Sequence, residues 1–171
     1  MDVTELILHQ HGEQRRMFAM LDEIPREDTE TLGAVWKRLE ILLETHAEAE
    51  ELFVYPLLLQ VGTGAADADD VNEEVEDAIK DHNEIRDGIR RAGAEPVGSE
   101  EWWEAVIDCR VANSDHMAEE ERQDLADFRR HTDLQTRHDI AVQFLRYESL
   151  RAAYGVTPHD KDPEEYVDQH S

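Results

Sequence analysis

Apolar residues recur at helical spacing in four long segments of the chain, with short polar stretches between them. No segment alternates apolar and polar residues in the way that is typical of a half-buried strand. The pattern predicts an all-α protein, an up-down four-helix bundle. The expected helices cover residues 2–23, 31–60, 69–92 and about 99–128.

Local signals mark several ends of these helices. Pro25 ends the first helix, and Thr29 or Thr31 can cap the second. Gly93 is a natural stop for the third helix, because glycine adopts the backbone conformation that often follows a helix. Ser99 has the side chain to cap the fourth.

A fifth helical pattern follows at residues 133–153, and an irregular tail begins at Gly155. We therefore predict a bundle domain at residues 1–130. Residues 131–171 are expected to form a C-terminal helix and tail that pack on the bundle or extend from it.

The charge of the chain excludes several classes of partner. Lys and Arg number 17 against 42 Asp and Glu, so the formal net charge is −25. A field of this sign repels nucleic-acid phosphates and anionic lipid surfaces, and we expect neither nucleic acid nor membrane as a partner. Cys109 is the only cysteine, which is typical of a reducing compartment. Because the chain also shows no basic leader and no long apolar run, we expect a cytoplasmic protein.

Nine histidines are the unusual feature of this acidic composition. Three of them have an acid four residues later, namely His9, His46 and His116. In so acidic a chain about two such pairs arise by chance, so this spacing alone does not indicate a site, although it places both groups on one helix face.

The surroundings of each histidine separate the candidates. His46 and Glu50 lie on the apolar side of their helix, and so do His11 and His82 on theirs, whereas His9 lies on a polar side. His116 and Glu120 have polar neighbours.

An internal repeat supports the pair His116 and Glu120. His46 follows His11 by 35 residues and His116 follows His82 by 34, and the second histidine of each couple has a glutamate four residues later. In a bundle of two such halves, the four imidazoles and two carboxylates can meet near the axis. Burying this many polar groups together makes sense mainly around metal.

The chemistry of these side chains narrows the choice of metal. Imidazole and carboxylate ligands suit iron, manganese or zinc, and six side chains exceed the needs of one tetrahedral ion. Two ions that share both carboxylates would each receive two nitrogens and two oxygens. The remaining histidines are expected to be solvated or to pack without metal; they are His131, His138, His159 and His170.

The order of these residues, with DHNEI around His82 and HAEAEELFVYP around His46, resembles the hemerythrin-like proteins with HHE cation-binding domains. The resemblance covers about residues 3–130. It implies a four-helix bundle with a non-haem di-iron centre that binds or processes dioxygen, peroxide or nitric oxide. The implied metal ligands are the histidines as terminal ligands and the two glutamates as bridges: His11, His46, Glu50, His82, His116 and Glu120.

The sequence departs from the oxygen-carrying hemerythrins at two positions. Ala78 stands where those proteins have a second histidine on the third helix. They also end in His-x-x-x-x-Asp, which makes Glu121 a rival to Glu120. Loss of an imidazole disfavours reversible oxygen carriage relative to peroxide or oxygen chemistry. Tyr55 is a candidate for a contact behind the ligands, although on an ideal helix it would point away from Glu50.

Two functional hypotheses follow. The first is a di-iron protein for dioxygen, peroxide or nitric oxide, with turnover left open. The second is a metal- or redox-sensing regulatory protein without turnover, in which the acidic surface or the segment after Phe128 meets a protein partner. An apolar face left exposed on the fifth helix would favour this alternative.

Overall fold

In the computed structural model, residues 1–65, 70–155 and 157–171 are described, and within them every regular element is an α-helix. This confirms the all-α prediction. The helices are α1 (Val3–Glu23), α2 (Thr29–Phe53), α3 (Tyr55–Val61), α4 (Val71–Ala94), α5 (Glu100–Arg122), α6 (Asp124–His131), α7 (Leu134–Tyr154) and α8 (Pro163–His170). The predicted start of the third helix at residue 69 lies outside the described residues.

Short polar side chains begin the long helices. The Ser99 hydroxyl accepts a hydrogen bond from the backbone N–H of Trp102, as predicted. The second helix is capped by Asp28, which accepts from the N–H of Thr31, and not by either threonine. Gly93 does not stop α4, which continues to Ala94.

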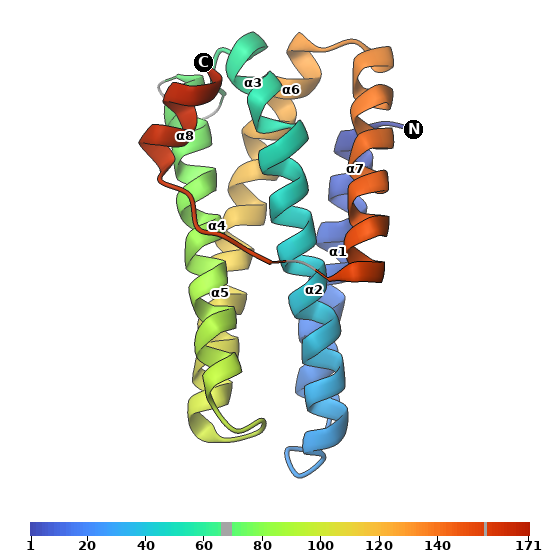
Figure 1. The fold of residues 1–171 in the computed structure, drawn as a ribbon, viewed down its shortest axis with the longest axis vertical. Coiled ribbons are helices and arrows are strands. Elements are labelled where there is room, and N and C mark those ends of the chain that lie inside the picture. Colours follow the sequence, from blue (N-terminus) through green and yellow to red (C-terminus); the bar gives the residue numbers. More distant parts are fainter. Residues whose placement is uncertain (66–69, 156) are drawn as a thin grey trace.

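The four long helices α1, α2, α4 and α5 run down, up, down and up in Figure 1 and form two adjacent hairpins. α3 and α6 lie at the end of the bundle opposite the two hairpin loops, α7 lies along α1 and α2, and α8 lies against α4 (Figure 1). Before α8, residues 157–162 run across the face of α4 (Figure 1).

Two of the predicted helices are interrupted near their C-terminal ends. Val54 separates α2 from α3, and Pro56 at the start of α3 has no N–H to continue the hydrogen-bond ladder. Gln123 separates α5 from α6 with no proline or glycine beside it. Because of the first break, the side chain of Tyr55 points in a different direction from the one that it would have on an unbroken helix.

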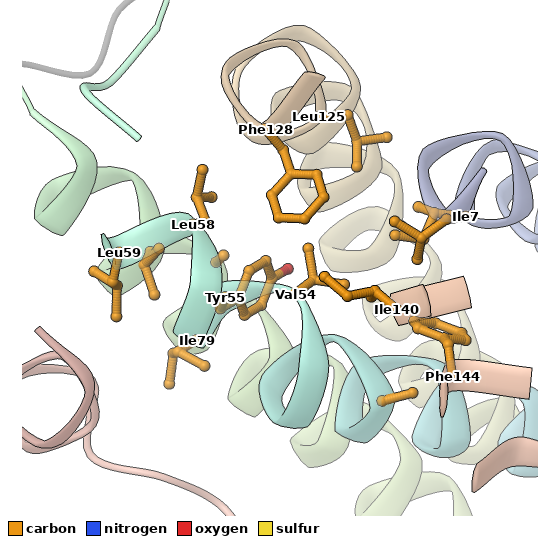
Figure 2. Close-up of a cluster of buried hydrophobic side chains, with 14 of the residues drawn as sticks. Ile7, Val54, Tyr55, Leu58, Leu59, Ile79, Leu125, Phe128, Ile140 and Phe144 are labelled. Atoms are coloured by element: carbon orange, nitrogen blue, oxygen red, sulfur yellow. The ribbon is translucent and has the colours of Figure 1, made fainter. Parts of the chain in front are cut away.

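Two apolar clusters fill the bundle, one toward each end. Ile7, Val54, Leu58 and Phe128 belong to the cluster at the α3–α6 end, together with Phe144 of α7 (Figure 2). The cluster near the hairpin loops has its largest side chains, three tryptophans, from α2 and α5: Trp36, Trp102 and Trp103. On α1, α2 and α4, residues of one cluster precede a buried histidine and residues of the other follow it, and His116 of α5 lies between the cluster residues of α5 and those of α6. The histidines therefore form a polar layer between two apolar ones.

The chain after the bundle is docked and partly helical. Ile140, Ala141 and Phe144 of α7 are buried in the cluster at the α3–α6 end. The tail, which the sequence predicted to be irregular, contains α8, whose Tyr166 and Val167 are buried in the same cluster. One side of α7 thus packs on the bundle, while Leu134, Val142 and Leu150 of the same helix are exposed.

Candidate metal centre

Each long helix of the bundle contributes one histidine to the polar layer. His11 comes from α1, His46 from α2, His82 from α4 and His116 from α5, and all four are at most 3% exposed. The two predicted carboxylates accompany them: Glu50 lies one turn after His46 on α2, and Glu120 lies one turn after His116 on α5, and both are buried. The structure thus brings all six predicted residues together.

The imidazoles form two close pairs, one from each hairpin. The Nε2 atoms of His11 and His46 are 3.1 Å apart, and those of His82 and His116 are also 3.1 Å apart. The pairs are therefore built from neighbouring helices of the same hairpin.

The two carboxylates connect one pair with the other. Oε1 of Glu50 is 3.0 Å from Nε2 of His46, and its Oε2 is 3.4 Å from Nε2 of His82. Oε2 of Glu120 is 3.1 Å from Nε2 of His11 and 3.9 Å from Nε2 of His116. Two overlapping sets of donor atoms result, each compact enough to hold an ion and sharing Glu50: His11, His46, Glu50 and Glu120 in one, Glu50, His82 and His116 in the other.

The outer nitrogens of the rings determine which tautomer each histidine adopts. Nδ1 of His11 is 2.9 Å from Oε1 of Glu121, and Nδ1 of His82 is 2.9 Å from Oε1 of Glu51. A carboxylate can only accept, so in both rings Nδ1 is the donor and Nε2 faces the cluster. Nδ1 of His46 likewise faces a side-chain oxygen, Oε1 of Gln10, at 2.6 Å. Holding the outer nitrogen in this way is how proteins orient metal-binding histidines.

The inward-facing atoms fit a metal better than they fit one another. Oε1 and Oε2 of Glu50 are buried and accept no hydrogen bond from the described part of the chain. An unpartnered buried carboxylate is costly, and facing imidazole nitrogens repel unless a cation lies between them. The donor set of nitrogen and oxygen atoms suits iron, manganese or zinc.

A comparison with models of known protein families also indicates a cation-binding domain. The model of the hemerythrin HHE cation-binding domain matches residues 2–128. The chain belongs to the hemerythrin HHE family. No significant match is found among curated proteins or solved structures. Among the described residues of this HHE protein, no helix has both the length and the apolar character needed to cross a membrane.

Burial and neighbouring charges shift the pKa values of several groups in the HHE cluster. Burial and the neighbouring Glu120 raise the pKa of Glu50 far above its usual range. Burial and the adjacent His116 lower the pKa of His82 to about 4. Burial also opposes protonation of His11, but hydrogen bonds with Glu120 and Glu121 outweigh it and raise the pKa of that imidazole. The metal-free cluster therefore keeps protons where a cation would otherwise lie.

The structure places the residues about which the sequence left questions open. Glu120 lies inside the cluster, whereas Glu121 lies behind His11, where it also pairs with Arg15. The Tyr55 hydroxyl donates to Oε1 of Glu120 at 3.3 Å, because the break at Val54 turns it inward. The histidines that were expected to be solvated or to pack without metal lie outside both donor sets, as does the exposed His9.

Glu51 also belongs to the surroundings of the centre, although it lies in an acid-rich stretch that gives no local sign of its burial. It is 1% exposed, and Oε1 is 2.9 Å from Nη2 of Arg86 as well as 2.9 Å from Nδ1 of His82. Burial raises the pKa of Glu51, but the bond from His82 and the charges of Arg86 and Lys161 outweigh it and lower that pKa to about 2. Glu44 is also buried, beside Arg86. The signal in the sequence was Arg86 itself, one turn after His82 on an apolar face.

A narrow acidic hollow between α4 and the α5–α6 junction reaches the centre. His116 and Glu120 form part of its wall, and Ala78 lies there where oxygen carriers of this family have a second histidine. The remaining lining residues are mostly acids: Glu74, Asp77, Asp81, Glu119, Gln123 and Asp124. The space that a histidine side chain at position 78 would occupy is thus bordered by carboxylates.

Proposed function

We propose that this HHE protein holds two iron ions in the polar layer and uses them to bind or process dioxygen, peroxide or nitric oxide. The observation that carries the proposal is the pair of overlapping donor sets that share Glu50. The family match supports cation binding, and the donor atoms favour iron, with manganese and zinc as alternatives.

The proposed role of each residue follows from its position in the cluster. The four imidazoles would hold the ions as terminal ligands, each through Nε2. Glu50 and Glu120 would bridge, because each carboxylate lies between imidazoles of different hairpins. Bound iron would supply redox chemistry toward small oxygen and nitrogen ligands.

The protein around the cluster controls what reaches it. The apolar clusters on both sides exclude bulk water from the layer, and the acidic hollow provides a polar route to His116 and Glu120. Tyr55 supplies a hydroxyl proton donor to Glu120 on the inner side. These features suit a small ligand, whereas a bulky substrate has no room beside the carboxylates.

Metal analysis of the purified protein tests the proposal. We expect two equivalents of iron in the native protein, with clear loss in His46→Ala and in Glu50→Gln. His9→Ala and Glu23→Gln are matched controls, since both residues are exposed, and they should retain the metal. One zinc per chain, or full iron in the ligand variants, would sink the di-iron proposal.

A second measurement concerns the small ligand. Peroxide consumption, or a visible spectrum that changes with dioxygen or nitric oxide, is expected of the iron-loaded protein. Iron-loaded protein that shows none of these would leave only a metal-holding role. The regulatory alternative is favoured only by the exposed Leu134, Val142 and Leu150 of α7, because the side of this helix that carries Phe144 is docked on the bundle.

A further inference from the structure

The part of the chain that follows the family match returns to the centre at two separate places. α7 reaches it through Glu148, and the segment before α8 reaches it through Lys161. Each contact ends behind a different imidazole, one in each histidine pair. Each contact therefore includes a residue outside the matched residues 2–128.

The first contact runs from α7 to His46. Nε2 of Gln10 donates to Oε2 of Glu148 at 2.8 Å, and Oε1 of Gln10 is 2.6 Å from Nδ1 of His46. The carboxylate fixes the amide nitrogen on its own side, so the amide oxygen must face the ring. Phe144, one turn before Glu148, packs edge-on against the same imidazole, with 6.0 Å between the ring centres.

The second contact runs from the tail to His82. Oε1 of Glu51 accepts from Nδ1 of His82, while Nζ of Lys161 donates to Oε2 of the same carboxylate. The hydroxyl of Tyr166 in α8 donates to the backbone oxygen of Glu51. The tail therefore holds both the side chain and the backbone of the residue that orients His82.

Lys161 is itself placed by the bundle. Its N–H donates to Oδ1 of Asn83 at 3.2 Å, and its carbonyl oxygen accepts from Nδ2 of Asn83 at 2.7 Å. Asp160 beside it pairs with Arg90 of α4 at 2.9 Å. Asn83 directly follows His82 in α4, so the lysine is anchored next to the ring that it influences.

We propose that the C-terminal segment from α7 to α8 is a working part of the metal centre, in which Glu148 and Lys161 are positioning residues for His46 and His82. Glu148 acts through Gln10 and Lys161 acts through Glu51. Both hold the outer ring nitrogen as the donor and thereby keep Nε2 directed at the carboxylates. The proposal rests on the proposed metal centre and adds that the centre extends beyond the HHE domain.

Paired substitutions separate positioning from general packing. Lys161→Met removes the positive charge beside Glu51, whereas Lys161→Arg keeps it. Glu148→Ala removes the acceptor of the Gln10 amide, whereas Glu148→Gln keeps an oxygen that can accept the same hydrogen bond. Lys80→Met removes an exposed charge from α4 and serves as the control. Long-range ¹H–¹⁵N spectra of the metal-free protein identify the tautomer of each imidazole, and transfer of iron to a chelator measures its release from the loaded protein.

Each positioning variant should disturb its own ring. In Lys161→Met we expect the nitrogen signals of His82 to shift and iron release to accelerate by about tenfold, the lower end of such outer effects. In Glu148→Ala the signals of His46 should shift instead, and Lys161→Arg, Glu148→Gln and Lys80→Met should stay close to the wild type.

The two measurements also distinguish failure of this proposal from failure of the proposed function. Unchanged His82 and His46 signals with unchanged release in both positioning variants would overturn the positioning role, whatever the metal content. Signals that shift equally for all four buried histidines would overturn it too, because they would reflect loss of packing. Ring-specific shifts in a protein that takes up no iron would support positioning and refute the di-iron proposal.

Discussion

The Nε2 atoms of His11 and His46 face each other at 3.1 Å, while the outer nitrogen of each ring faces a different acceptor. Two neutral rings held in this way would point lone pairs at each other, so the metal-free protein must place a proton between them. Hydrogen bonds with Glu120 and Glu121 raise the pKa of His11 against the effect of burial, which keeps that proton in place. A metal ion would replace the proton and relieve the same repulsion.

Metal removal should therefore lower the stability of the bundle strongly. A ligand that binds only the folded state at a thousandfold excess over its Kd adds about 4 kcal/mol of stability per site. Thermal unfolding with iron and after chelation measures the difference. The shift should be largely lost in His46→Ala and kept in His9→Ala, and an equal shift in both variants would contradict a role for this layer.

Gly88 permits a close contact between α4 and α5. A Cβ atom at this position would lie 2.6 Å from Cβ and 2.9 Å from Cα of Cys109, so α4 and α5 would have to separate. We expect Gly88→Ala to cost about 1–3 kcal/mol, as overpacking of a core does. Gly93→Ala, also in α4, meets nothing within 4 Å and should be neutral or stabilising. Chemical denaturation measures both, and equal stability of the two variants would refute close packing at Gly88.

The sequence predicts much of this architecture because the relevant signals are local. Helical periodicity gave the long helices, and the inward position of each histidine followed from its neighbours three and four residues away. The recurrence of the couple His11 and His46 in His82 and His116 indicated a shared site without any knowledge of the fold.

Other features depend on contacts between distant residues and have no local signal. Glu51 lies among acids that face water, and its burial depends on Arg86 from another helix and on Lys161 from the tail. The break at Gln123 has no proline or glycine to announce it. α8 is short, and it is held by tertiary contacts such as the buried Tyr166.

The acidic hollow should speed the uptake of Fe²⁺. Asp77 and Glu119 are exposed lining residues, and carboxylates along a narrow path raise the local concentration of cations. The double variant Asp77→Asn and Glu119→Gln should take up Fe²⁺ several-fold more slowly at low ionic strength, with the difference fading as salt is added. Stopped-flow spectra record the uptake. Glu23→Gln, at the far end of α1, should have no effect, and the same slowing in that control would refute a local route.

Tyr55→Phe removes the hydroxyl that donates to Oε1 of Glu120. Loss of one hydrogen bond to a buried carboxylate should cost about 1–3 kcal/mol. Because Glu120 lies between His11 and His116, the visible spectrum of the iron-loaded protein should also shift. Denaturation and absorption spectra of the variant check both effects. An unchanged spectrum would show that the hydroxyl has no influence on the centre.

Glu148 should make the stability of the metal-free protein depend on pH. Burial raises the pKa of Glu148 from its ordinary value of 4.5 to about 7, although the hydrogen bond from Gln10 opposes the rise. The folded state therefore favours the neutral carboxyl more than the unfolded chain does. Its contribution to stability is fully present below about pH 4.5 and is lost as the pH rises through about 7.

The size of this effect follows from the shift after allowance for solvent. One pKa unit corresponds to about 1.4 kcal/mol, and because the side chain is only partly buried we expect a loss of about 1–2 kcal/mol between pH 5 and pH 8. Glu148→Gln stays neutral throughout and should lose less stability over the same range, whereas Glu23→Gln should follow the wild type. Urea unfolding in the presence of a chelator measures the three proteins at each pH. Parallel curves for Glu148→Gln and the wild type would mean that the carboxyl ionises in the folded protein as it does in the unfolded chain, and that its burial in α7 has no energetic consequence.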